Sequence, residues 1–72
     1  MHKDNELLDK YPREFWEKQI FQWVRDEKAR YAITRNFLDG VPYEDIATEL
    51  NISRTTVYKK ISEYSKILFK HI

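Results

Sequence analysis

The stretch that decides the fold is residues 43–61, which read YEDIATELNISRTTVYKKI. Apolar residues recur at a spacing of four in both halves, at Ile46 and Leu50 and then at Val57 and Ile61. Each pair therefore lies on one face of a helix. The pattern predicts a short helix, a tight turn and a second helix beginning at residue 53 or 54, which is a helix-turn-helix.

Each residue at the predicted turn suits its position. Asn51 stands where the backbone of such a turn is left-handed, and Asn is the best tolerated residue there after Gly. Ile52 is expected to plug the turn into the core, and Ser53 to cap the second helix through its hydroxyl oxygen. Ala47 falls where the two helices should cross most closely, since a larger side chain would push them apart.

Two further helices are predicted before the motif. The first shows apolar residues on one side of a helix over 12–25: Phe15, Trp16, Ile20, Trp23 and Val24. The second, over 27–38, shows another such face: Ala29, Ala32, Ile33 and Phe37. One straight helix cannot turn both faces toward the same core, because they are rotated by roughly a third of a turn from one another. We therefore predict a break at Asp26, which caps the second helix, and a left-handed end at Gly40.

The predicted fold is all-α, a small four-helix domain with helices over 12–25, 27–38, 43–50 and 53–69. The chain has 72 residues, enough for one domain, which we place at 12–70 after a flexible N-terminus at 1–11. It has no cysteine, and its longest uncharged run has only the six residues Gln19 to Val24. These features predict neither a disulfide framework nor a membrane span, and they suit the cytoplasm.

The charge is divided unevenly along the chain. Residues 1–50 carry eight Lys and Arg against eleven Asp and Glu, a net charge of −3. Residues 51–72 carry five basic residues against one acidic residue, a net charge of +4. The positive charge thus lies on the second motif helix and its continuation, which is the distribution expected where DNA phosphates are neutralised. A basic, solvated helix face is the simpler alternative.

The motif resembles region 4 of sigma factors and, among its relatives, small phage transcription regulators with a sigma-region-4-like domain. The resemblance rests on the run LDGVPYEDIA at residues 38–47 and on the spacing of four from Val57 to Ile61. It covers about Glu27 to Leu68. The chain departs from it at Pro42, where such sequences often have Ser or Thr as a helix cap.

The predicted function is sequence-specific DNA binding by a transcription regulator in a bacterial or phage-infected cell. The second motif helix should enter the major groove. The candidates for base contacts are Arg54, Thr55, Tyr58 and Lys59. The candidates for phosphate contacts are Ser53, Thr56, Lys60 and Lys66, and Lys59 fits this role as well.

Other functions and partners stay open from the sequence. The motif would also suit a module of a phage DNA-packaging complex, or an adaptor that binds protein without touching DNA. RNA polymerase is a candidate partner. The aromatic helix over 12–25 either packs across the other helices or forms a homodimer through residues such as Trp16 and Phe21. We expect no enzyme, cofactor or metal, since His2 and His71 stand at opposite ends without ligand-spaced neighbours.

Overall fold

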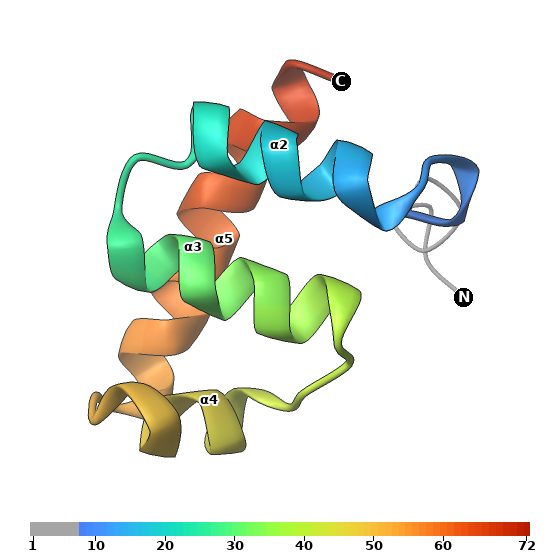
Figure 1. Cartoon of the computed structure of the whole chain (residues 1–72). Helices are drawn as coiled ribbons and strands as arrows, with labels where there is room; N and C mark the ends of the chain where they lie inside the picture. The colour runs from blue at the N-terminus through green and yellow to red at the C-terminus, as the bar shows by residue number, and fades with distance from the viewer. Residues whose placement is uncertain (1–7) are drawn as a thin grey trace.

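The computed structural model describes residues 8–72 and is built from helices joined by short connections (Figure 1). After a helical turn at residues 8–10, the elements are α2 (Arg13–Trp23), α3 (Glu27–Ile33), the π-helical turn η1 (Thr34–Leu38), α4 (Tyr43–Leu50) and α5 (Arg54–Lys70). No strand occurs in residues 8–72, and the predicted all-α class is confirmed. Within the same residues, none of the helices is long and apolar enough to cross a membrane.

The break between the first two predicted helices is present. The chain is extended at Val24 and at Asp26, so α2 ends at Trp23, two residues earlier than predicted. The Asp26 carboxylate accepts hydrogen bonds from the backbone N–H groups of Lys28 and Ala29, at 2.9 and 3.2 Å. Asp26 is therefore the predicted cap of α3, satisfying amides that the helix itself leaves free.

The helix predicted over 27–38 is divided into α3 and η1 without a gap. In η1 the hydrogen bonds reach one residue further back, as shown by the Asp39 N–H, which donates to the Thr34 carbonyl at 3.2 Å. Gly40 follows with the predicted left-handed conformation, φ 70°. The side-chain amide of Asn36 then donates to the Val41 carbonyl at 2.9 Å. These two contacts hold the wide turn closed and direct the chain toward α4.

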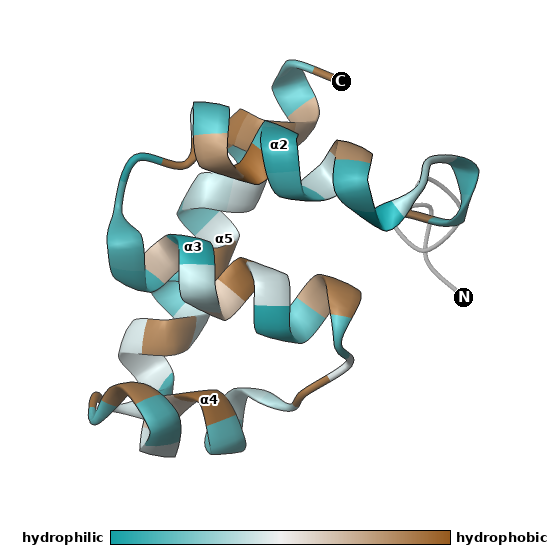
Figure 2. Cartoon of the chain, in the orientation of Figure 1, coloured by the Kyte–Doolittle hydropathy of each residue, from teal (hydrophilic) through white to brown (hydrophobic). Residues whose placement is uncertain are grey.

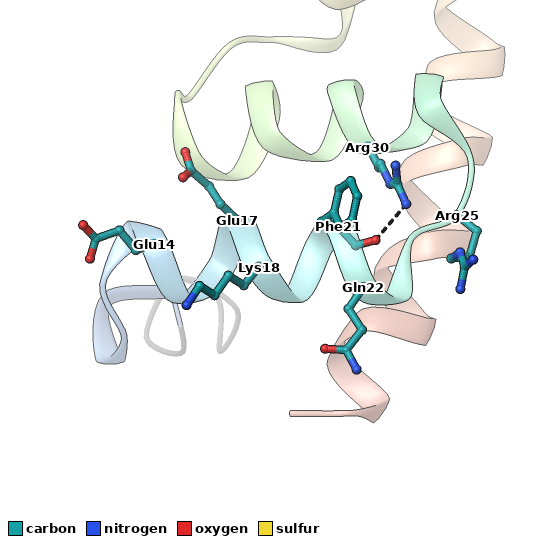
Figure 3. Close-up of a pocket in the computed structure, with 7 residues that line it drawn as sticks. All are labelled: Glu14, Glu17, Lys18, Phe21, Gln22, Arg25 and Arg30. Atoms are coloured by element: carbon teal, nitrogen blue, oxygen red, sulfur yellow. Dashed lines mark hydrogen bonds between the residues drawn. The ribbon is translucent and has the colours of Figure 1, made fainter.

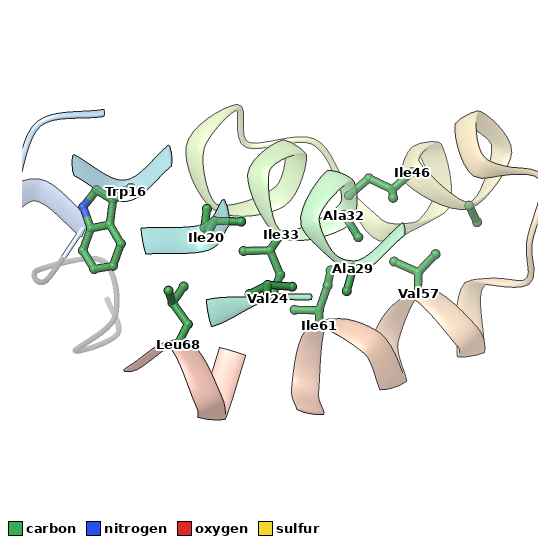
Figure 4. Close-up of a cluster of buried hydrophobic side chains, with 11 residues drawn as sticks. Trp16, Ile20, Val24, Ala29, Ala32, Ile33, Ile46, Val57, Ile61 and Leu68 are labelled. Carbon is green, nitrogen blue, oxygen red and sulfur yellow. The ribbon is translucent and has the colours of Figure 1, made fainter. Parts of the chain in front are cut away.

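The core is a continuous cluster between α5 and the helices that lie against it (Figure 4). Its buried members are Trp16, Ile20, Val24, Ala29, Ala32, Ile33, Ile46, Ala47, Val57, Ile61 and Leu68. Hydrophobic and hydrophilic residues alternate along each helix (Figure 2), as in amphipathic helices that pack by one side. Val57 and Ile61, predicted to share one face of the second motif helix, are buried, and the same face of α5 continues through half-buried Tyr64 to buried Leu68.

Residues 8–11 lie on the folded domain, in contrast to the flexible N-terminus predicted over 1–11. Leu8 and Tyr11 pack against the core, and the Trp16 indole N–H donates to the Leu8 carbonyl at 3.2 Å. The Tyr11 ring stacks on Phe15, with the ring centroids 4.3 Å apart. Aromatic contacts thus hold this segment against the domain, although its polar composition suggested that it would be frayed. The rest of the predicted flexible segment lies outside the described residues.

A chain of ion pairs joins η1 to its neighbours. The Arg35 guanidinium bonds Asp39 at 3.2 Å and Glu49 of α4 at 2.9 Å, and Arg13 of α2 bonds Asp39 at 2.8 Å. Hydrogen bonds from Arg35 and then from the Tyr31 hydroxyl lower the pKa of Glu49. These side chains are between 27% and 49% exposed, so each ion pair contributes little to the stability of the fold.

Candidate nucleic-acid interface

The turn between α4 and α5 has the geometry that its residues predict. Asn51 is left-handed, with φ 58° and ψ 45°, and no other non-glycine residue in the described range has a positive φ. Its N–H donates to the Thr48 carbonyl at 3.3 Å, and the Ile52 N–H donates to the Ala47 carbonyl at 3.1 Å. These two hydrogen bonds end α4 and turn the chain directly after it, so that α5 begins only a few residues later.

Small and branched side chains hold the two motif helices together. Ile46 of α4 and Val57 of α5 are fully buried, and Ala47 beside them is only 8% exposed. Ile52 is half-buried against the same cluster. Because Ala47 presents only a methyl group, the helices can approach closely at this point. The start of α5 lies beside α4 at the end of the molecule away from α2 (Figure 1).

Two hydroxyls predicted to hold phosphates are engaged in capping α5. The Ser53 hydroxyl oxygen accepts from the Thr56 N–H at 3.1 Å and lies 2.8 Å from the Thr56 hydroxyl. Ser53 is therefore the predicted N-cap. Pro42, at the corresponding position before α4, makes no side-chain cap. The acidic residues Glu44 and Asp45 stand in the first turn of α4 instead, where the helix dipole favours negative charge.

The residues predicted to read bases share the exposed surface of the first turns of α5. Thr55 and Lys59 are exposed and lie opposite the buried stripe. The side chain of Arg54 is 69% exposed, and Tyr58 is 57% exposed. All four base-contact candidates are thus exposed within the first two turns of α5. Lys66 is exposed further along the same helix.

Two residues of α4 belong to this surface although the sequence did not single them out. The Tyr43 ring meets Tyr58 edge-on, with the ring centroids 5.9 Å apart. One carboxylate oxygen of Glu44 lies 3.9 Å from the Arg54 guanidinium. Both contacts involve exposed side chains at the start of α5. They join residues 10 to 15 positions apart across the turn, so only the packing of α4 on α5 reveals them.

Lys60 is placed differently from its prediction as a phosphate contact. Its ammonium group lies 2.6 Å from the Asp26 carboxylate, and both side chains are about three-quarters buried. Asp26 thus caps α3 with one oxygen and pairs with α5 through the other. The Lys60 side chain leaves α5 toward α3 and away from Thr55 and Lys59. We therefore omit Lys60 from the proposed DNA contacts.

The pair between Asp26 and Lys60 predicts a pH dependence of stability. The hydrogen bond from Lys60 lowers the pKa of Asp26 below its ordinary value of 3.8. A carboxylate with a lowered folded-state pKa stabilises the fold above its unfolded pKa, and this contribution is lost as the pH falls through the folded value. We expect Asp26→Asn, which retains a capping oxygen, to lower the free energy of unfolding by about 1 kcal/mol at neutral pH.

That difference should vanish in acid, once the parent carboxylate is protonated. Urea unfolding of both proteins at neutral pH and well below pH 3.8 measures it. Lys60→Met is the matched control, because Asp26→Asn should cost much less in that background. An equal loss at both pH values would mean that the charge of Asp26 contributes nothing.

Comparison with known proteins places this motif in a family. The family model of sigma-70, region 4 matches residues 26–63, which is more than half of the chain. The match begins at the cap of α3, includes η1 and α4, and ends within α5. No match is found among curated proteins or solved structures. The resemblance seen in the sequence is confirmed: the chain belongs to the sigma-70 region 4 family, whose helix-turn-helix is a DNA-binding module.

Proposed function

We propose that this protein is a sequence-specific DNA-binding transcription regulator that inserts the start of α5 into the major groove. The observation that carries the proposal is the shared exposure of Arg54, Thr55, Tyr58 and Lys59 on the projecting end of a helix-turn-helix. The major groove is about 12 Å wide and admits one α-helix, whose first turns then meet the base edges. Arg54, Lys59 and Lys66 add exposed positive charge to α5, which supports contact with DNA phosphates.

The contacts divide into two roles. Arg54 is proposed to bind guanine through both guanidinium nitrogens, since this is the commonest specific contact of arginine with DNA. Thr55 and Tyr58 are proposed to meet a thymine methyl group. Lys59 and Lys66 are proposed to neutralise phosphates, and the hydroxyls of Ser53 and Thr56 would assist only where capping leaves a lone pair free.

Two other functions are separated by experiment. A packaging-complex module would bind duplex DNA without sequence preference, and a protein-binding adaptor would not bind it. Selection of bound sequences from a random duplex pool, with the purified chain, distinguishes all three. A defined consensus supports the regulator.

Contact with RNA polymerase and action in the cytoplasm of a bacterial or phage-infected cell belong to the same proposal. Co-purification of polymerase on the selected site tests the first of these.

Arg54→Ala should reduce sequence preference. We expect it to weaken binding to the selected site by about 1–3 kcal/mol and to leave binding to random duplex nearly unchanged, because only a base contact distinguishes the two. Fluorescence anisotropy on both duplexes at one salt concentration measures this. We expect the variant to fold, because the side chain is exposed, and circular dichroism checks this. Equal weakening on both duplexes would mean that Arg54 contacts a phosphate and not a base.

Lys59→Ala should have the opposite signature. We expect weaker binding to both duplexes by a similar factor, and a salt dependence whose slope falls by about one unit, since one phosphate contact is lost. A salt series with each duplex gives the slope. Lys10→Ala is the matched control, because Lys10 is also an exposed lysine but lies outside the family match. If the slopes of the parent and both variants coincide, Lys59 does not face a phosphate.

A further inference from the structure

The outer side of α2 carries an open groove whose centre is an exposed phenylalanine (Figure 3). Phe21 is 67% exposed, more than any other large hydrophobic residue in the described range. The groove is lined by Glu14, Glu17, Lys18, Phe21, Gln22, Arg25 and Arg30. It lies outside residues 26–63 except for Arg30, so the family match does not account for it.

Phe21 is held in position by Arg30. The Arg30 guanidinium lies over the Phe21 ring, 4.2 Å from its centroid, and donates to the Phe21 carbonyl at 2.8 Å. It also donates to the Val24 carbonyl. A large apolar ring that is both exposed and fixed loses little conformational freedom when a partner covers it, which favours a contact at this point.

The charges along the groove would be complementary between two copies of it that run in opposite directions. Glu14 stands toward the N-terminal end and Arg25 at the C-terminal end, with Lys18 and Phe21 between them. Neither Glu14 nor Arg25 makes an ion pair with another residue in the range 8–72. Within these residues, both charges can meet a partner that runs in the opposite direction.

We propose that this groove binds a second copy of the same chain, with the two α2 helices antiparallel about a two-fold axis. Such a contact is isologous, so each pairing occurs twice. Glu14 of each copy would face Arg25 of the other. Phe21 would cover the aliphatic stem of the opposite Lys18, near the axis. We expect weak, concentration-dependent association, as is usual for a contact made by a single helix of each copy.

The position of the groove suits two copies acting together. α2 packs against the C-terminal part of α5, far from the end that carries Arg54 (Figure 1). A second copy at α2 therefore leaves both candidate DNA surfaces uncovered. Paired recognition helices read two half-sites and so multiply specificity. The dimer goes beyond the proposed function and does not depend on it, because its contacts are separate from those with DNA.

The aromatic helix contributes to this dimer only through Phe21. Trp16, the other residue predicted for such a contact, is 1% exposed and belongs to the core. Trp16→Ala would therefore disturb the fold and cannot report on association. Phe21→Ala removes an exposed ring and should leave the fold intact.

Sedimentation equilibrium of the full chain, from micromolar to submillimolar concentration, tests the proposal. We expect the parent mass to rise toward that of a dimer and Phe21→Ala to stay monomeric. Glu14→Arg and Arg25→Glu should each weaken association on the order of tenfold or more, because two attractive pairs become repulsive. Glu63→Arg, a reversal at an exposed glutamate of α5, is the control and should associate like the parent.

Mixing the two reversal variants gives the sharpest result. In the antiparallel arrangement, the introduced arginine of one variant faces the introduced glutamate of the other, and the remaining arginine faces the remaining glutamate. An equimolar mixture of Glu14→Arg and Arg25→Glu should therefore form dimers that neither variant forms alone. A monomeric parent at every concentration, or a mixture no heavier than its components, would overturn the proposal. DNA binding by that monomer would show that the proposed function is unaffected.

Discussion

Ala47→Glu is expected to unfold the domain. Ala47 is 8% exposed and lies beside the fully buried Ile46 and Val57, with no cationic side chain in the buried cluster around it. A glutamate there would separate α4 from α5 or bury a charge without a partner. Burial of an unpaired charge costs several kcal/mol, about 3–5 in measured cases. A domain of this length has only roughly 4–11 kcal/mol of stability in total, so the loss is a large share of it and unfolds a domain near the lower end of that range.

The measurement is helicity by circular dichroism together with the melting temperature. Thr48→Glu is the matched control, because Thr48 is the next residue of α4 and is exposed. It should retain the helical signal and melt within a few degrees of the parent, since surface changes cost within about 0.5 kcal/mol. Native helicity and an unchanged melting temperature in Ala47→Glu would contradict the close packing of α4 on α5.

Trp16→Ala is expected to destabilise the domain by about 3–5 kcal/mol, the usual cost of removing a buried tryptophan. Trp16 is the largest fully buried side chain in the described range. Its ring meets Phe69 of α5 edge-on, with the ring centroids 5.9 Å apart, and its indole N–H bonds the Leu8 carbonyl. Its removal would leave a cavity between α2 and α5 and free the segment around Leu8.

Urea unfolding followed by circular dichroism measures this loss. Trp16→Phe keeps an aromatic ring but loses the indole N–H, and should fall between the parent and Trp16→Ala. Phe21→Ala is a second control on the same helix, since its ring is 67% exposed. If Trp16→Ala and Phe21→Ala unfolded at the same urea concentration, α2 would not be part of the core.

The sequence alone determined the features that depend on a few neighbouring residues. Asn51 at a left-handed turn, Ser53 as a cap and Asp26 as a helix start each involve partners within four positions. Backbone geometry fixes such contacts whatever the rest of the chain does. The buried stripe from Val57 to Leu68 follows from helical periodicity in the same way. These local rules are specific enough to identify the helix-turn-helix.

Only the tertiary structure decided which side chains of each helix are available for binding. Lys60 and Lys59 are adjacent lysines, but Lys60 meets Asp26, which is 34 positions away. Trp16 and Phe21 are aromatic residues of one helix, yet the first is buried and the second exposed. The π-helical turn at 34–38 was likewise not predicted, because it is closed by hydrogen bonds from the segment that leads to α4. The physical reason is common to all three: periodicity gives the direction of a side chain around its own helix, whereas its partner depends on how the helices pack.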